Sequence, residues 1–299
     1  MSHQNTINRE PPGLAVARRH KCASGSTEQD ATIIDIGDGV KIGGNRIVIM
    51  AGPCSVENEE QIISIAKKLK KIGVSMLRGG AYKPRTSPHD FQGLGREGLE
   101  YLKRASKLTG LKVITEVLDP RDVELVTNFA DILQIGARSM QNFPLLREVG
   151  KSRTAVVLKR GMSATYREFL LAAEYIMVGG NEKVILCERG IRTWVDELRF
   201  TLDLSAVPYL RQQTHLPIIV DPSHGTGNAS LVIAMSKAAI ACGTDGLLIE
   251  AHLRPQESKS DAAQTISIEE LKKSMPILAR VAKAVGRKID GDNNGDLPR

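Results

Sequence analysis

Several basic side chains stand directly after short apolar runs of this sequence, where they could bind an anion. These residues are Arg78, Lys83, Arg85, Arg138, Lys159, Arg160 and Arg189, with Thr86 beside them. Guanidinium groups bind phosphate and carboxylate through paired hydrogen bonds. If the apolar runs are strands that end at one mouth, the sequence predicts a polyanionic ligand there. Any one of these residues could instead pair with Asp or Glu at a rim, but that alternative explains the whole set less well.

A second set of residues has the chemistry of metal ligands. Cys54 follows the first apolar run, His224 follows the seventh, Glu250 ends the eighth, and Asp261 lies in the loop beyond it. A thiolate, an imidazole and two carboxylates form a mixed site that suits Mn, Fe, Co or Zn. A single Cys or His is more often a packed core residue. The metal interpretation therefore depends on all four residues meeting at one place.

The elements that must position these residues follow from eight short apolar runs that alternate with amphipathic stretches. The predicted strands are 47–51, 74–78, 112–116, 131–135, 154–158, 183–187, 217–221 and 246–250. Repeated strand and helix units predict a parallel sheet. AGPCSVE follows the first run, where a dinucleotide-binding open sheet would carry G-x-G-x-x-G. We therefore predict an α/β fold that closes as a (β/α)8 TIM barrel, with the active site at the carboxyl ends of the strands and the first, seventh and eighth strands adjacent.

The ends of the chain differ from this pattern. Residues 1–30 and 288–299 are polar and aperiodic, so we expect two mobile tails around a single catalytic barrel domain at 31–287. Apolar residues at 33–37 and 47–52 flank a glycine-rich turn, which predicts a short N-terminal β-hairpin leading into the first strand.

Composition narrows the class of protein. The net charge is +7, but aromatic residues make up 4% of the chain, too few to interleave with basic residues as nucleic-acid binders do, so we expect no nucleic-acid partner. No apolar stretch of about 18 residues is present to span a membrane. The four cysteines lie far apart, which favours a reducing, cytoplasmic location. The basic residues near the N-terminus could also belong to an organelle transit peptide, although a disordered leader is the preferred interpretation.

Seven segments of the sequence resemble the 3-deoxy-7-phosphoheptulonate synthases (DAHP synthases). The segments are AGPCSVE at 51–57, LRGGAYKPRTSP at 77–88, QIGAR at 134–138, LKRG at 158–161, ILCERGIRT at 185–193, DPSHGTG at 221–227 and IEAH at 249–252. The resemblance runs from about residue 33 to 285 and is strongest to the compact microbial subfamily that lacks a regulatory domain.

The resemblance implies roles for particular residues. It places Cys54, His224, Glu250 and Asp261 at the ligand positions of a divalent metal ion. Phosphoenolpyruvate would be held by Arg78, Ala137, Arg138, Lys159 and Arg189, and erythrose 4-phosphate by Lys83, Pro84, Arg85 and Thr86. Lys159, Lys83 and His224 are the catalytic candidates, and which lysine donates a proton stays open. Ala262 stands where the family commonly has Gly, which could alter the loop that carries Asp261 and change metal affinity.

The function implied by the resemblance is the condensation of phosphoenolpyruvate with D-erythrose 4-phosphate and water. The products are 3-deoxy-D-arabino-heptulosonate 7-phosphate and phosphate, in the first step of the shikimate pathway of aromatic amino acid biosynthesis. One alternative is a sister synthase that uses a different aldose, and another is a non-catalytic barrel that acts as a binding partner. The family also implies a homo-oligomer, a dimer or tetramer. Since about 30 residues precede the hairpin, we expect no built-in feedback inhibition by Phe or Tyr.

Overall fold

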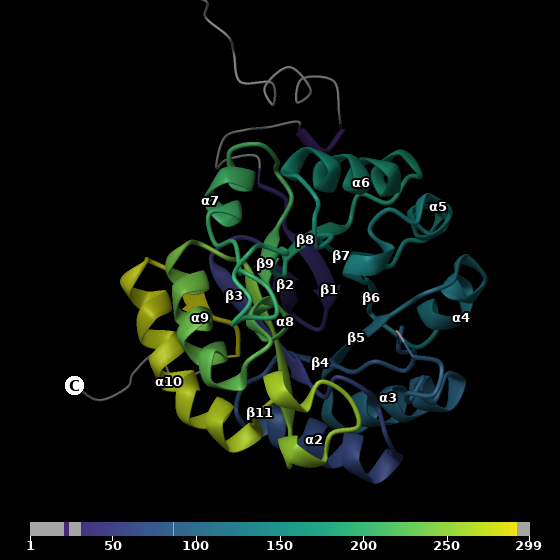
Figure 1. Ribbon diagram of the computed structural model, residues 1–299, viewed down its shortest axis with the longest axis vertical. Helices are drawn as coiled ribbons and strands as arrows, with labels where there is room; N and C mark the ends of the chain where they lie inside the picture. The colour runs from purple at the N-terminus through teal and green to yellow at the C-terminus, as the bar shows by residue number, and fades with distance from the viewer. Residues whose placement is uncertain (1–20, 24–30, 86, 292–299) are drawn as a thin grey trace, which may run out of the picture.

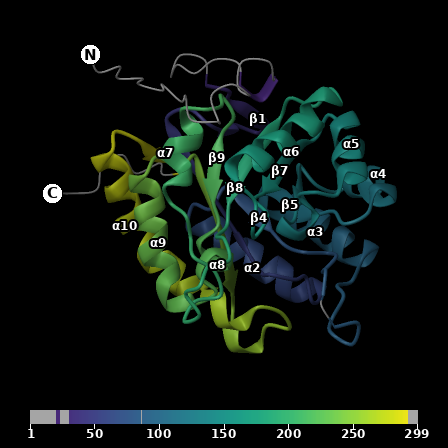
Figure 2. The ribbon, with the colours of Figure 1, turned by 45° about the horizontal axis from the view of Figure 1, so that its top comes forward.

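A closed barrel of parallel strands forms the centre of the molecule. The computed structural model describes residues 21–23, 31–85 and 87–291, and within them eight parallel strands form the barrel wall (Figures 1 and 2). These strands are β3 Arg46–Gly52, β4 Met76–Arg78, β5 Lys112–Glu116, β6 Ile132–Ile135, β7 Ala155–Lys159, β8 Val184–Glu188, β9 Ile218–Val220 and β10 Gly246–His252. β10 pairs with β3, from Gly246 opposite Val48 to Glu250 opposite Gly52, and this pairing closes the ring. The predicted (β/α)8 barrel is confirmed.

Helices surround the barrel and follow its strands (Figure 1). They are α2 Glu59–Lys71, α3 Arg96–Thr109, α4 Val123–Thr127, α5 Phe143–Lys151, α6 Tyr166–Val178, α7 Ala206–Arg211, α8 Pro222–Thr226, α9 Ala229–Ala241 and α10 Ile268–Ala284. α8 is a short helix directly after β9, ahead of the longer α9. In α2 the Asn58 side chain accepts a hydrogen bond from Gln61 N, and Ile62, Ile65 and Leu69 are buried. That apolar stripe, at helical spacing, packs the helix onto the barrel.

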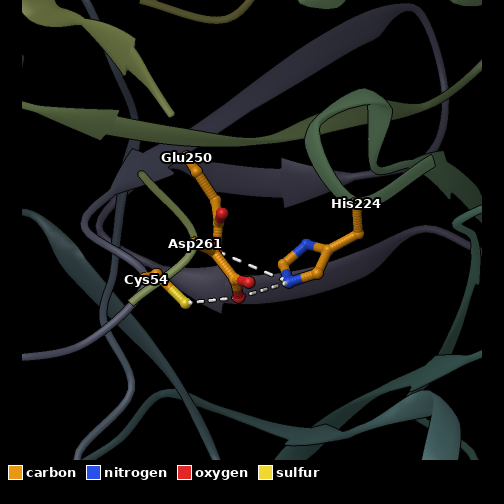
Figure 3. A group of neighbouring side chains, drawn as sticks. All are labelled: Cys54, His224, Glu250 and Asp261. Carbon is orange, nitrogen blue, oxygen red and sulfur yellow. Dashed lines mark hydrogen bonds and ion pairs between the residues drawn. The ribbon is translucent and has the colours of Figure 1, made fainter. Parts of the chain in front are cut away.

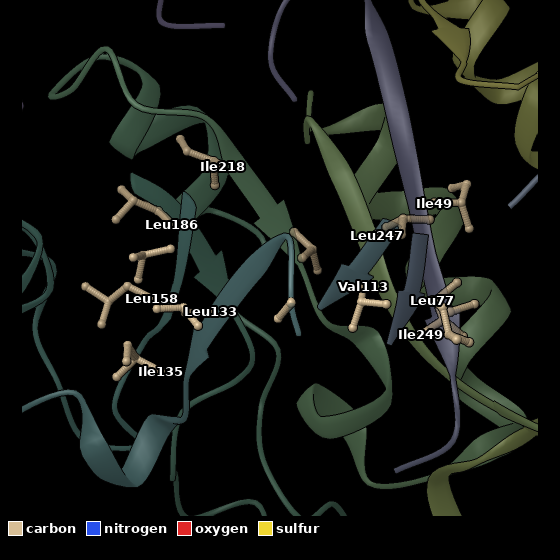
Figure 4. Close-up of a cluster of buried hydrophobic side chains, with 14 of the residues drawn as sticks. Ile49, Leu77, Val113, Leu133, Ile135, Leu158, Leu186, Ile218, Leu247 and Ile249 are labelled. Atoms are coloured by element: carbon tan, nitrogen blue, oxygen red, sulfur yellow. The ribbon is translucent and has the colours of Figure 1, made fainter. Parts of the chain in front are cut away.

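Two apolar layers hold the barrel together because successive strand residues point to opposite faces. Residues such as Ile49, Leu77, Leu133 and Leu186 belong to the large buried cluster that also contains the helix stripes (Figure 4). Alternate residues, among them Met50, form a second cluster inside the barrel. The site at the strand ends therefore stands on a packed interior.

The predicted N-terminal hairpin that leads into the first barrel strand is confirmed, although its second arm lies before residue 47. β1 Ile34–Gly37 pairs antiparallel with β2 Val40–Ile42, whereas the sequence had suggested 47–52 as the second arm. Ile34 and Ile42 pack with the cluster inside the barrel, and Asp38 forms an ion pair of 2.8 Å with Lys112 at the start of β5. The hairpin thus lies at the amino ends of the strands, opposite the site.

Parts of both expected tails are ordered. The 3₁₀ helix η1 Lys21–Ala23 places Cys22 in the buried core, where its backbone N donates to Glu174. At the other end β12 Lys288–Ile289 pairs with β3, and Asp290 accepts a hydrogen bond of 2.7 Å from Ser75. The predicted tail at 288–299 therefore starts too early. Residues 1–20, 24–30 and 292–299 lie outside the described residues.

Gly52 gives a test of how tightly the neighbouring strands β3 and β4 approach. A Cβ at this position would lie 2.1 Å from the carbonyl oxygen of Arg78 in the neighbouring chain segment. We expect Gly52→Ala to lower the free energy of unfolding by about 3 kcal/mol, measured by urea denaturation, because backbone must move to relieve the overlap.

The control is Gly39→Ala in the hairpin turn, where φ is +82° and a Cβ would meet nothing within 4 Å. Only the cost of the left-handed conformation applies there, about 1 kcal/mol. Equal losses in the two variants would contradict the steric account.

Candidate metal and anion site

A cavity of about 190 Å³ opens at the carboxyl ends of the strands. Its basic lining residues are Arg78, Lys83, Arg85, Arg138, Lys159, Arg189 and Arg199. Pro84, Ala137, His224 and Asp261 also line it. The structure therefore brings the predicted substrate residues together, except for Thr86, which lies outside the described residues. The concentration of positive charge suits an anionic ligand.

The four predicted metal ligands meet beside this cavity (Figure 3). One potential ligand atom from each of Cys54, His224, Glu250 and Asp261 lies within 4.8 Å of the others. His224 Nε2 is 3.5 Å from Glu250 Oε1 and 3.9 Å from Asp261 Oδ2, and Cys54 Sγ is 3.1 Å from Asp261 Oδ2. Four side chains from three separate parts of the barrel thus point at one small volume.

The donor set and its spacing fit a divalent ion. Ligand atoms lie about 2.0 to 2.3 Å from a zinc-sized ion, so two ligands of one ion are separated by up to roughly 4.6 Å. The observed spacing needs only small side-chain shifts to match. Burial, together with the Glu250 carboxylate, raises the pKa of Cys54 to about 12, so the thiol keeps its proton until a cation stabilises the thiolate.

Side chains around the ligands hold the two carboxylates in place. Glu250 accepts hydrogen bonds from Arg78 and from Gln264 Nε2, the second at 2.6 Å. Asp261 Oδ1 accepts one of 3.0 Å from Arg199. Burial tends to raise the pKa of Glu250, but its interactions with His224 and with the Arg78 guanidinium outweigh this and lower the pKa overall. Both carboxylates are therefore ionised and oriented.

The loop around Asp261 accommodates the alanine that follows it. Asp261 itself has the left-handed conformation, with φ of 52°, and Ala262 begins the 3₁₀ helix η6 Ala262–Gln264. The position that differs from the family pattern therefore does not need the conformational freedom of glycine.

His224 is oriented by a buried carboxylate for which the sequence had predicted no role. Asp221 caps α8: its Oδ1 accepts a hydrogen bond of 2.9 Å from His224 N, and its Oδ2 lies 2.8 Å from His224 Nδ1. Asp221 is fully buried, and Lys159 Nζ also donates to its Oδ2. Asp221 stands in the DPSHGTG segment, so the signal was present in the sequence. Arg199 and Gln264 had no such signal.

Lys83 connects the metal and anion parts of the site. Its Nζ lies 2.9 Å from Cys54 Sγ and 3.3 Å from Cys54 O, and the residue is 7% exposed. Burial tends to lower the pKa of Lys83, but its interactions with Cys54 and with the Glu116 carboxylate outweigh this and raise the pKa overall. The Lys83 side chain is therefore protonated at neutral pH and lies next to the ligand cluster.

Arg138 and Arg189 differ from most other basic residues of the cavity, because neither forms a salt bridge with any described residue. Arg189 stacks over the ring of Phe200, 4.0 Å from its centroid, and burial lowers the pKa of Arg189. Arg138 donates to Pro84 O at 3.3 Å, which ties the rim to the segment that carries Lys83. These guanidinium groups line the cavity and keep donors for a ligand.

Arg160 does not belong to this site, and the prediction that it does is wrong. Its guanidinium donates to Glu188 and to Asp203, each at 2.9 Å, and stacks on Tyr166. Lys159 and Arg160 are consecutive, so their side chains leave the end of β7 in different directions. Lys159 faces the cavity, and Arg160 is taken up by a buried ion-pair network.

The fold and the site define a class: a (β/α)8 barrel with a mixed cluster of potential metal ligands next to a basic pocket. Comparison with known families agrees, because the model of the DAHP synthetase I family matches residues 27–287. The chain belongs to this family. Among its described residues, no helix is both long enough and apolar enough to cross a membrane.

Individual relatives support the family assignment. The phospho-2-dehydro-3-deoxyheptonate aldolase of Thermotoga maritima is 50% identical over 277 residues, covering 93% of this chain and 82% of the relative. Its crystal structure superposes with a TM-score of 0.87, covering 91% of this chain and 79% of that chain. The structure of a truncated form superposes with a TM-score of 0.82, covering 87% of this chain and 95% of that chain. The 2-dehydro-3-deoxyphosphooctonate aldolase of Geobacter sulfurreducens is 31% identical, covering 82% of this chain and 95% of the relative.

The Arg160 network yields a stability test. Arg160→Met leaves the buried Glu188 carboxylate without its main cation, so we expect a loss of about 3 to 5 kcal/mol in the free energy of unfolding at pH 7. Burial already raises the pKa of Glu188, and Arg160 partly offsets this. A carboxyl whose pKa is higher in the folded state destabilises the protein above that pKa, so the deficit should shrink as pH falls from about 7 to 5.

Arg104→Met is the matched control, because Arg104 pairs with Glu59 on the surface. The loss in the free energy of unfolding of Arg104→Met should stay below about 1 kcal/mol and change little with pH. A deficit in Arg160→Met that grows on acidification would contradict the account.

Proposed function

We propose that this chain condenses phosphoenolpyruvate with D-erythrose 4-phosphate and water to give 3-deoxy-D-arabino-heptulosonate 7-phosphate and phosphate, the first step of the shikimate pathway. The observation that carries the proposal is the four-ligand cluster at the edge of a basic cavity, in a chain 50% identical to a phospho-2-dehydro-3-deoxyheptonate aldolase. The carbon count agrees, because a seven-carbon product needs four carbons besides the three of phosphoenolpyruvate.

The basic residues have two tasks in this reaction. Two phosphates and a carboxylate repel one another when they are held side by side, and the arginines and lysines of the cavity offset that repulsion while they fix the geometry. We assign Arg138, Lys159 and Arg189 to phosphoenolpyruvate, with Arg78 and Ala137 beside it. Lys83, Pro84, Arg85 and Thr86 are assigned to erythrose 4-phosphate. Arg85 is held at 3.1 Å from Asp90 in the described structure.

Carbon 3 of phosphoenolpyruvate attacks the aldehyde carbon, water adds at carbon 2, and cleavage of the carbon–oxygen bond then releases phosphate. A divalent ion held by Cys54, His224, Glu250 and Asp261 would supply Lewis-acid polarisation of the aldehyde. Lys83 lies against this cluster, so we assign it the proton that the new hydroxyl requires. Lys159, held by Asp221, orients the phosphoenolpyruvate anion.

We extend the proposal to the setting of the enzyme. The mixed sulfur, nitrogen and oxygen donors favour Mn, Fe, Co or Zn. The reaction is placed in the cytoplasm, and the chain is proposed to act as a homodimer or homotetramer.

A sister synthase is the second candidate, and the octonate aldolases among the relatives favour it. Their eight-carbon product name implies a five-carbon acceptor, and one of them is 31% identical to this chain. The greater identity to the heptonate enzyme supports the four-carbon acceptor here.

Phosphate release with both substrates tests the activity and its metal dependence. We expect turnover that is lost on chelation and restored by Mn²⁺, Fe²⁺, Co²⁺ or Zn²⁺, and a loss of at least about 100-fold in Cys54→Ser, because a thiolate ligand is removed. Cys242→Ser is the control: Cys242 is a partly buried free cysteine at the end of α9. Full activity of the chelated protein would refute metal dependence.

Acceptor choice is tested with four-carbon and five-carbon aldose phosphates under the same conditions. We expect kcat/KM to favour the four-carbon acceptor by about 100-fold or more, since polar groups of a site left unpaired by the wrong substrate are costly. A preference for the five-carbon aldose would establish the sister synthase instead.

A further inference from the structure

One carboxylate oxygen is shared between the anion part and the metal part of the site. Asp221 Oδ2 accepts a hydrogen bond from Lys159 Nζ and lies 2.8 Å from His224 Nδ1. Its other oxygen accepts from His224 N at 2.9 Å and caps α8. Lys159 lines the anion cavity, and His224 belongs to the ligand cluster.

The ionised state of Asp221 fixes the role of each ring nitrogen of His224. The buried carboxylate accepts hydrogen bonds from the Lys159 ammonium and from His224 N, as an ionised group that is paired with a cation does. An ionised carboxylate can only accept hydrogen bonds, so Nδ1 must donate. Nε2 then keeps its lone pair, directed at the oxygens of Glu250 and Asp261.

Two donors compete for the charge on this oxygen. An anion in the cavity draws the Lys159 ammonium toward itself and leaves more of the Asp221 charge to His224, which makes the imidazole a stronger metal ligand. In the other direction, a cation on Nε2 makes Nδ1–H a stronger donor, draws on Asp221 and leaves Lys159 freer for the anion.

We propose that Asp221 is a positioning residue that couples the two halves of the site, so that a divalent cation on His224 and a tetrahedral dianion at Lys159 each bind more tightly when the other is present. The inference rests on the proposed function in one respect: it takes the four-ligand cluster to be a cation site. Because coupling of binding free energies is reciprocal, either ligand can be used to measure it.

Direct attraction between a cation and an anion would also couple the sites, and it does not depend on Asp221. The substitution that separates the two effects is Asp221→Asn. The amide oxygen can still accept from His224 N and cap α8. The amide nitrogen that replaces the second oxygen cannot accept from Lys159 or from Nδ1.

The experiment titrates the full chain with Co²⁺ and follows the absorption of the bond between cobalt and the Cys54 thiolate. It is done in sodium sulfate and in sodium chloride at equal ionic strength, with sulfate as the dianion. We expect sulfate to tighten Co²⁺ binding about 10-fold in the wild type, and by no more than about twofold in Asp221→Asn. In chloride, Asp221→Asn should bind Co²⁺ about 10-fold to 100-fold more weakly.

A second variant keeps the test decisive if Asp221→Asn folds poorly. Lys159→Met leaves the shared oxygen to His224 alone, so Co²⁺ should bind several-fold more tightly than in the wild type in chloride. In the double variant with Asp221→Asn, Lys159→Met should tighten Co²⁺ binding less than it does in the wild type. Asp203→Asn is the control: this carboxylate also pairs with a buried cation, Arg160, but it lies outside the ligand cluster and should leave the sulfate effect unchanged.

The outcomes separate this inference from the proposed function. Equal sulfate effects in the wild type and in Asp221→Asn, or no tightening in Lys159→Met, would overturn the coupling role while the cation site stands. Absence of Co²⁺ binding in the wild type in both salts would overturn the cation site, and with it both proposals.

Discussion

The pairing of β10 with β3 is the constraint on which the site depends. It closes the barrel and sets Glu250 opposite Gly52, two residues before Cys54, so ligands nearly 200 positions apart in the chain come to one seam. β9 lies next to β10, and the short α8 after it carries His224. Backbone pairing therefore determines the ligand geometry, and the apolar layers inside and outside the barrel keep the pairing in register.

Charge balance explains how so many buried ionic groups can coexist at this seam. The anionic ligands each have a cation beside them: Glu250 has Arg78 and Asp261 has Arg199, while Asp221 is held by Lys159. Buried charges are costly unless they are paired and hydrogen-bonded. The same pairs fix the directions of the carboxylates, so the arrangement that stabilises the fold also prepares the site for a cation and an anion at adjacent positions.

The sequence predicted the strands well and brought Cys54, His224, Glu250 and Asp261 to one end of the barrel, because alternating apolar runs mark the strands and barrel sites lie at the carboxyl ends of strands. It could not say which way a side chain turns at a strand end, and so Arg160 was placed in the site although Glu188 and Asp203 hold it elsewhere. Hydrogen bonds that hold a ligand side chain from a distant part of the chain, such as the bond from Arg199 to Asp261, leave no periodic pattern in the sequence, so the sequence could not predict them. β12 was missed for a similar reason: a two-residue strand is too short to show alternation.

We propose that four side chains at the barrel seam hold one divalent cation next to an anion pocket. Anomalous diffraction from crystals of the full chain grown with Mn²⁺ and phosphoenolpyruvate tests it most directly. We expect one strong manganese peak within bonding distance of Cys54 Sγ, His224 Nε2 and a carboxylate oxygen each of Glu250 and Asp261, with the phosphoenolpyruvate phosphorus in the adjacent basic cavity. A manganese peak elsewhere, or a ligand set without the thiol and the imidazole, would contradict it.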